Sequence, residues 1–246
     1  VIVAGGAGDI GRGVVAACRA NGHEVAVLDL ARSLEKNPPP AGTRTVSLDA
    51  TDPAAVEAAF RALDTAWGAA DALVFLIGFT ITPPTRIDAL SPAQWDEVIA
   101  GNLRSAYLVA RAALPLLRKG RDPAIVAVAS GLGINVLPGF GPYSAAKAGL
   151  IAFTKSLAIE NAPLIRANAV APSAIETAFM KGGTGRGPDD PDAAAWFQGA
   201  DYARLFPLGR LAEVDDVVGP ILFLMGAAAR FMTGQTLHVN GGRLMP

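Results

Sequence analysis

Tyr143 and Lys147 stand four positions apart in the segment GPYSAAKAGL, whose composition favours a helix. Side chains with this spacing lie on one helix face, so the phenol and the ammonium are predicted neighbours. A phenol titrates at about 10 in water, but an adjacent positive charge favours its ionised form. The pair therefore predicts a general acid and base at Tyr143, against the alternative of a solvated helix face.

Two further polar residues accompany this pair. Ser130 ends the apolar run AIVAVAS, so its hydroxyl is expected at the carboxyl edge of a sheet, where it can donate a hydrogen bond to a substrate oxygen. Asn102 falls inside the long apolar segment WDEVIAGNLRSAYLVARAALPLL. An amide in such a helix caps or kinks it, or holds an internal water that relays protons to Lys147.

Residues 1–11, VIVAGGAGDIG, read as a strand, a glycine cluster and the start of a helix. Such a turn brings backbone N–H groups close to a pyrophosphate, and the positive end of the helix adds to the attraction. A tight turn without a ligand is the alternative. The carboxylate of Asp9 is expected to cap the helix that follows.

Acidic residues end the next two predicted strands. Asp29 follows the first strand at the spacing where a carboxylate accepts hydrogen bonds from the adenosine ribose, and its charge would repel a 2′-phosphate. NAD is therefore favoured over NADP, although Arg12 and Arg32 are near in sequence. Asp49 is expected at the adenine edge or, equally, as the cap of its own loop.

Short apolar runs alternate with longer helical segments, which indicates βα units and a parallel sheet covered on both faces. The predicted fold is a doubly wound α/β sheet of about seven strands in one domain, residues 1–246. The predicted strands are 1–4, 24–29, 43–48, 71–78, 123–129, 164–171 and 235–239. The predicted helices are 10–21, 53–66, 91–118, 143–160 and 213–228.

Composition excludes several other classes. A chain of 246 residues with 51% apolar residues and a formal charge of −1 is expected to fold and lacks the basic surface that nucleic acid requires. The longest apolar stretch, 217–229, is shorter than the roughly 20 residues of a membrane span. A single cysteine and two histidines predict no metal site. We expect a cytoplasmic protein that acts on a small molecule.

The set Asn102, Ser130, Tyr143 and Lys147, downstream of a glycine turn, closely resembles the short-chain dehydrogenase/reductase family in its single-domain form. Further landmarks are WDEVIAGNL, YSAAK, RANAVAPSAIET, PLGRLAEVDDV and TGQTLHVNGG, in the family's order over essentially the whole chain. The resemblance implies a Rossmann-like fold, a nicotinamide cofactor and reversible alcohol-to-carbonyl chemistry.

The resemblance also implies roles for single residues. Tyr143 would donate and accept the proton, and Ser130 would polarise the substrate oxygen. Lys147 would bind the nicotinamide ribose and lower the Tyr143 pKa, while Asn102 would hold a relay water. Thr177, with the Ile175 backbone, would contact the carboxamide. The predicted cofactor contacts are Gly5, Gly8, Asp9, Ile10, Gly11, Asp29, Leu30, Asp49, Ala50, Gly78, Tyr143, Lys147, Pro172, Ile175 and Thr177.

The chain departs from the family pattern in three places. Ala4 and Asp9 stand where the family usually has threonine and glycine, so Asp9 can weaken pyrophosphate binding by repulsion unless it caps the helix. Phe, Leu and Ile at 75–77 replace an Asn-Asn-Ala run that braces the sheet near the adenosine. Ser173 replaces a customary glycine. None of these changes touches the four reacting positions.

Two segments outside the alternation, 79–90 and 178–206, follow strands at the edge where open α/β sheets bind ligands. The second is expected to form a substrate lid. The residues expected to contact the substrate are mostly apolar, which favours a hydrophobic secondary alcohol or ketone as the substrate. The predicted substrate contacts are Ser130, Leu132, Phe140, Tyr143, Phe179 and Trp196.

Other functions are also compatible with these residues. The altered glycine turn permits a nucleotide-sensing or scaffolding protein without turnover. A lyase or epimerase could use the same Tyr/Lys chemistry, although its relatives usually carry a larger substrate region. Apolar stretches in helices 91–118 and 143–160 predict a homo-oligomer, a dimer or a tetramer.

Overall fold

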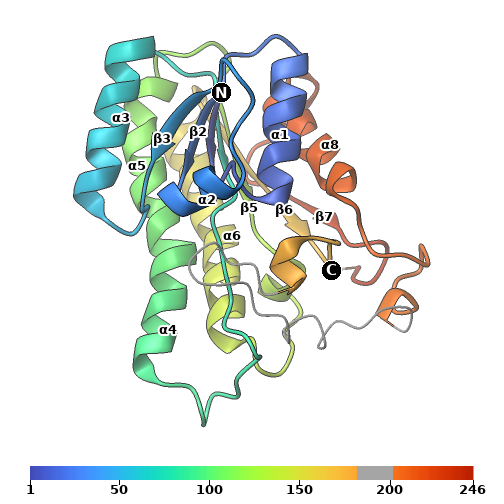
Figure 1. Ribbon diagram of the computed structural model, residues 1–246. Helices are drawn as coiled ribbons and strands as arrows, with labels where there is room; N and C mark the ends of the chain where they lie inside the picture. The colour runs from blue at the N-terminus through green and yellow to red at the C-terminus, as the bar shows by residue number, and fades with distance from the viewer. Residues whose placement is uncertain (182–201, 246) are drawn as a thin grey trace.

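A computed structural model of the chain describes residues 1–181 and 202–245 and contains one seven-stranded sheet (Figure 1). Its order is β3-β2-β1-β4-β5-β6-β7, and every neighbouring pair is parallel. The predicted doubly wound α/β fold is confirmed. The strands are β1 Ile2–Ala4, β2 Ala26–Asp29, β3 Arg44–Ser47, β4 Ala72–Phe75, β5 Ala124–Val128, β6 Arg166–Pro172 and β7 Thr236–Val239.

Helices cover both faces of this sheet. One apolar cluster joins the sheet to α3, α5 and α6, and a second joins the other face to α1 and α8, as Figure 1 shows. The α-helices are α1 Asp9–Ala20, α2 Ala31–Lys36, α3 Pro53–Trp67, α4 Pro92–Ile99, α5 Ser105–Leu117, α6 Gly141–Asn161 and α8 Val214–Met225. The shorter turns are η1 Ala100–Arg104, η2 Gly131–Gly133, η3 Ala178–Lys181 and η5 Ala227–Ala229.

Local sequence explains where two of these helices begin. Asp52 caps α3 by accepting from the Ala54 and Ala55 amides, and proline follows it in the first turn. Ser91 and Gln94 form a reciprocal capping box at the start of α4. Such caps satisfy first-turn N–H groups that have no partner within the helix.

The predicted helix 91–118 is present from Pro92 to Leu117, but its hydrogen-bond pattern changes in the middle. The chain forms α4, a π-helical turn η1 and then α5, and Asn102 lies in the π turn. The short helix α2 was not predicted, and β4 ends at Phe75 rather than at 78. Both segments, α2 and the loop that follows β4, line the cavity.

The order of the sheet reverses beside β1, which pairs with β2 on one side and with β4 on the other. Open α/β sheets bind ligands at such a switch point, outside the carboxyl ends of the strands. No helix in the described ranges is long and apolar enough to span a membrane. In the same ranges, no three or more His, Cys, Asp or Glu side chains are grouped so that they could bind a metal ion.

Candidate active site

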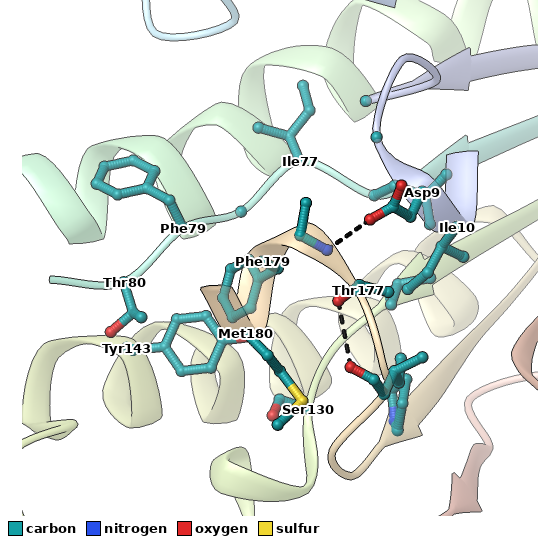
Figure 2. A pocket seen from close by; sticks show the side chains of 18 of the residues that line it. Asp9, Ile10, Ile77, Phe79, Thr80, Ser130, Tyr143, Thr177, Phe179 and Met180 are labelled. Atoms are coloured by element: carbon teal, nitrogen blue, oxygen red, sulfur yellow. Dashed lines mark hydrogen bonds between the residues drawn. The ribbon is translucent and has the colours of Figure 1, made fainter. Parts of the chain in front are cut away.

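A cavity of about 530 Å³ opens at the carboxyl edge of the sheet. Every predicted site residue that the structure describes lines it, except Asn102. Trp196, and residues 182–201 of the predicted lid, lie outside the described residues. Figure 2 shows how Asp9 and Ile10 lie on one side and Ser130, Tyr143 and Phe179 on another.

The reacting cluster comes from the ends of β5 and α6. Ser130 lies just beyond β5, and its hydroxyl accepts a hydrogen bond of 3.1 Å from the Leu132 amide. Tyr143 and Lys147 lie in the first turns of α6, both buried. The Lys147 ammonium is 5.5 Å from the centre of the Tyr143 ring and donates to the Val128 carbonyl at 3.0 Å. The predicted proximity of the phenol and the ammonium is therefore present in the structure.

Burial controls the charges of this pair. It raises the pKa of Tyr143 to about 12, although a hydrogen bond with the Ser130 side chain opposes the rise. It also lowers the pKa of Lys147 to about 7. The expected lowering of the Tyr143 pKa by Lys147 is not seen, because desolvation disfavours both charged forms. At neutral pH the phenol keeps its proton.

The Asn102 amide is fully engaged with the backbone. Its nitrogen donates to the carbonyls of Phe79 at 2.8 Å and Val98 at 2.9 Å, and its oxygen accepts from the Phe79 amide at 3.3 Å. These bonds tie the loop after β4 to the π turn. A Cβ at Gly78 would lie 2.6 Å from the Asn102 oxygen and 2.9 Å from the Lys147 nitrogen. Asn102 therefore fixes the backbone beside Lys147 without lining the cavity.

The glycine turn leaves room for an anionic ligand. Gly5 has a φ of +86°, and a Cβ there would come within 2.9 Å of the Ile77 nitrogen, so the segments that follow β1 and β4 approach as only glycine allows. Gly8 is the N-cap of α1 and no side chain caps this helix, in contrast to α3 and α4. First-turn amides that face the cavity suit the pyrophosphate of a dinucleotide.

The prediction that Asp9 caps α1 is wrong. Its carboxylate accepts from the Ala178 amide at 2.7 Å and pairs with Arg12 at 2.5 Å (Figure 2). The cause is a tertiary contact, because η3 brings the Ala178 N–H group to the Asp9 carboxylate. Asp9 therefore joins the cofactor side of the cavity to the segment that carries Phe179 and Met180.

Asp29 and Asp49 lie at the nucleotide end. Asp29 accepts from the Ala7 amide at 2.9 Å and the Leu30 amide at 2.8 Å, and burial raises its pKa. It braces the glycine turn while lining the cavity. Asp49 accepts hydrogen bonds from the Thr51 amide at 2.9 Å and from the Thr51 hydroxyl at 2.7 Å. These bonds correspond to the predicted alternative in which Asp49 caps its own loop.

The substrate side is mostly apolar. The Phe179 ring lies 5.9 Å from the Tyr143 ring at 43°, and both belong to a small apolar cluster with Phe79. The Thr177 hydroxyl donates to the Ile175 carbonyl at 3.2 Å, as Figure 2 shows. Leu132 and Phe140 also line the cavity.

A family model described as enoyl-(acyl carrier protein) reductase matches residues 5–243 of this chain. It covers both the glycine turn and the reacting cluster. The chain belongs to the short-chain dehydrogenase/reductase family. It is therefore an oxidoreductase with the Rossmann-like fold, and the family's cofactor is a nicotinamide dinucleotide.

Curated and solved family members support this assignment. The chain is 32% identical to the 3-oxoacyl-[acyl-carrier-protein] reductase FabG of Salmonella typhimurium over 99% of this chain and 96% of that protein. The same-named enzyme of Escherichia coli is 34% identical over 83% and 79%. An aldohexose dehydrogenase of Thermoplasma acidophilum superposes with a TM-score of 0.87 at 27% identity, over 98% of this chain and 92% of the other.

The lining residues that were not predicted include Tyr202, Arg243 and Leu244. They lie before and after the last strand, in segments that are distant from the reacting cluster in sequence. The sequence VNGG at 239–242 indicates a turn after the last strand. It does not indicate that the side chains of Arg243 and Leu244, which follow it, reach the cavity.

Proposed function

We propose that the chain transfers a hydride between NAD(H) and a secondary alcohol or ketone, with Tyr143 as general acid and base. The observation that carries this proposal is the buried cluster of Ser130, Tyr143 and Lys147 on the cavity wall. Ser130 hydrogen-bonds Tyr143, so one substrate oxygen can contact both hydroxyls. When bound, the nicotinamide accepts or supplies the hydride.

The protonation state of the cluster favours ketone reduction. With a pKa of about 12, Tyr143 holds a proton at neutral pH and can donate it to an oxygen that gains negative charge. Ser130 donates a second hydrogen bond to that oxygen. Lys147 becomes charged more readily when an anion forms beside it, because its pKa of about 7 lies near neutrality.

The remaining predicted residues would hold the cofactor. The uncapped amides at the start of α1 suit the pyrophosphate, and Asp29 favours NAD by repelling a 2′-phosphate. Thr177 and the Ile175 backbone would hold the carboxamide, beside Pro172. Asn102 acts through the loop that it fixes next to Lys147.

The substrate is proposed to have an apolar body. Leu132, Phe140, Phe179 and Met180 present apolar surface beside the reacting cluster. The curated relatives are named for the reduction of a 3-oxoacyl group, which carries a ketone. Nothing in the described residues favours the non-catalytic alternative, since Ser130, Tyr143 and Lys147 are present together.

Tyr143→Phe tests the proposal. Removal of the proton donor should lower ketone reduction about 10²–10⁴-fold while NADH binding stays unchanged. Tyr107→Phe is the matched control, because Tyr107 is exposed on α5, packs edge-on against Phe153 and does not line the cavity. Reduction is followed by the loss of NADH absorbance, and cofactor binding by fluorescence. A Tyr143→Phe enzyme as active as the control would overturn the proposal.

A homo-oligomer is also proposed. Trp95 and Ile159 are exposed on α4 and α6, where a second copy can cover them. Light scattering on the purified chain should give more than the 25.2 kDa of one copy.

A further inference from the structure

We propose that Arg243 binds a carboxylate on the substrate, so that the preferred substrate is an oxo or hydroxy acid with an apolar body. This inference rests on the proposed function and adds the substrate class. Arg243 lines the same cavity as the reacting cluster. It is half-buried there, in the segment that follows β7.

The turn after β7 fixes the place of Arg243. Gly241 and Gly242 have φ values of +58° and +83°, and a Cβ on Gly242 would come within 3.0 Å of Pro207. The buried Asn240 side chain accepts from the Gly242 amide at 3.0 Å and donates to the Leu244 carbonyl at 2.8 Å. The Asn240 side chain therefore holds the backbone immediately before and immediately after Arg243.

Aromatic rings hold the guanidinium itself. It lies 5.0 Å from the centre of the Tyr202 ring and 5.3 Å from that of Phe206, and it donates to the Tyr202 hydroxyl at 2.7 Å. Stacked guanidinium groups lose little further freedom when they bind a planar anion. Within residues 1–181 and 202–245 no carboxylate pairs with Arg243, and most of its five N–H donors are available.

Its position is on the substrate side of the cavity. Leu244, the next residue, reaches to within 3.7 Å of where a Cβ on Gly131 would lie, and Gly131 adjoins Ser130. The other described cations of the cavity lie elsewhere. Arg12 pairs with Asp9, Arg32 and Lys36 lie on α2 at the nucleotide end, and Lys147 belongs to the reacting cluster.

The chemistry points to a carboxylate. One guanidinium fork matches one carboxylate in geometry and charge. A phosphate dianion would require a second cation or a helix N-terminus, and the described residues place neither beside Arg243. The substrate would thus have its reacting oxygen between Ser130 and Tyr143 and its carboxylate at Arg243, with the apolar wall between them.

Binding can be measured without turnover. Calorimetry on the protein loaded with oxidised NAD would use levulinate and its next two straight-chain homologues, each beside its methyl ester. Because oxidised NAD cannot reduce these ketones, only binding is recorded. In wild type, at least one acid should bind about 10- to 100-fold more tightly than its ester.

Arg243→Met should abolish that preference while leaving ester affinity within about threefold, since methionine also packs on aromatic rings. Arg243→Lys should keep part of the preference. Arg230→Met, which removes an exposed arginine outside the cavity, is the matched control and should keep all of it.

Equal binding of acids and esters by wild type, or an acid preference that survives in Arg243→Met, would overturn the inference. Failure of the proposed function has a different signature, because it would appear as no reduction of any of these ketones by wild type with NADH.

Discussion

The reacting end and the nucleotide end of the cavity satisfy their polar groups in different ways. At the reacting end, Tyr143 and Lys147 are both buried, and burial keeps the phenol protonated and brings the pKa of Lys147 down to about 7. At the nucleotide end, Asp9 and Arg12 form an exposed ion pair, and Asp29 supports the glycine turn. Removing a group from the reacting end should therefore affect turnover, whereas removing one from the nucleotide end should affect affinity and selectivity.

The largest effect is expected from Lys147→Met. Loss of the ammonium removes the positive charge that stabilises an anionic Tyr143 after proton donation, so turnover should fall about 100-fold or more. Steady-state ketone reduction measures this loss. Lys155→Met, on the exposed side of the same helix, should keep wild-type turnover. Equal turnover of the two variants would remove the distinction between the ends of the cavity.

Lys147 also predicts a pH dependence of stability. Its pKa is about 7 when folded and 10.5 when unfolded, so the unfolded chain binds more protons between these values. The free energy of unfolding should therefore rise with pH through this window. Below pH 7 the burial cost is fully present, so Lys147→Met should gain stability over wild type there and lose that gain towards pH 10.5. Chemical denaturation across this range measures it, and a constant difference would contradict the cause.

A smaller effect is expected from Asp29→Ser. Loss of this carboxylate removes the repulsion of a 2′-phosphate near Arg32, which also lines the cavity. The ratio of kcat/KM for NADPH over NADH should rise about 10-fold. Asp49→Ser, at the same edge, removes a carboxylate that accepts from Thr51 in its own loop and should leave the ratio unchanged. A wild-type enzyme that prefers NADPH would break the assignment to NAD.

The smallest effects are expected at Asp9. Asp9→Asn keeps an oxygen that can accept from Ala178 but removes a negative charge near the start of α1, so NADH should bind a few-fold more tightly. Asp9→Gly also frees η3, so the KM for ketone should rise roughly 2- to 10-fold as Phe179 loses its support. If both variants changed the ketone KM equally, the Ala178 contact would have no positioning role.

Much of the fold follows from local patterns. Each of the seven strands was predicted because its apolar run is bounded by turn residues, and α3 and α4 begin within one residue of the predicted helix starts at 53 and 91. The proximity of Tyr143 and Lys147 also follows from helical spacing alone. These features depend on residues that are close together in the chain, so they can be predicted from short sequence patterns.

Three features that the sequence did not reveal share one physical cause, namely contacts between distant residues. The π turn at Asn102 depends on bonds to Phe79, 23 residues earlier. The Asp9 carboxylate turns away from its helix towards an amide 169 residues later. Arg243 reaches the cavity through a turn anchored on segment 206–208. Local propensity carries no information on such contacts.

Label transfer tests the central claim most directly. Wild type would reduce levulinate methyl ester with NADH deuterated at the transferring carbon, in ordinary water, and the alcohol would be analysed by NMR. Direct hydride transfer predicts one deuterium on the carbinol carbon, and none when unlabelled NADH is used in heavy water. A solvent-derived label at that carbon, or no reduction, would contradict hydride transfer at the Ser130–Tyr143–Lys147 cluster.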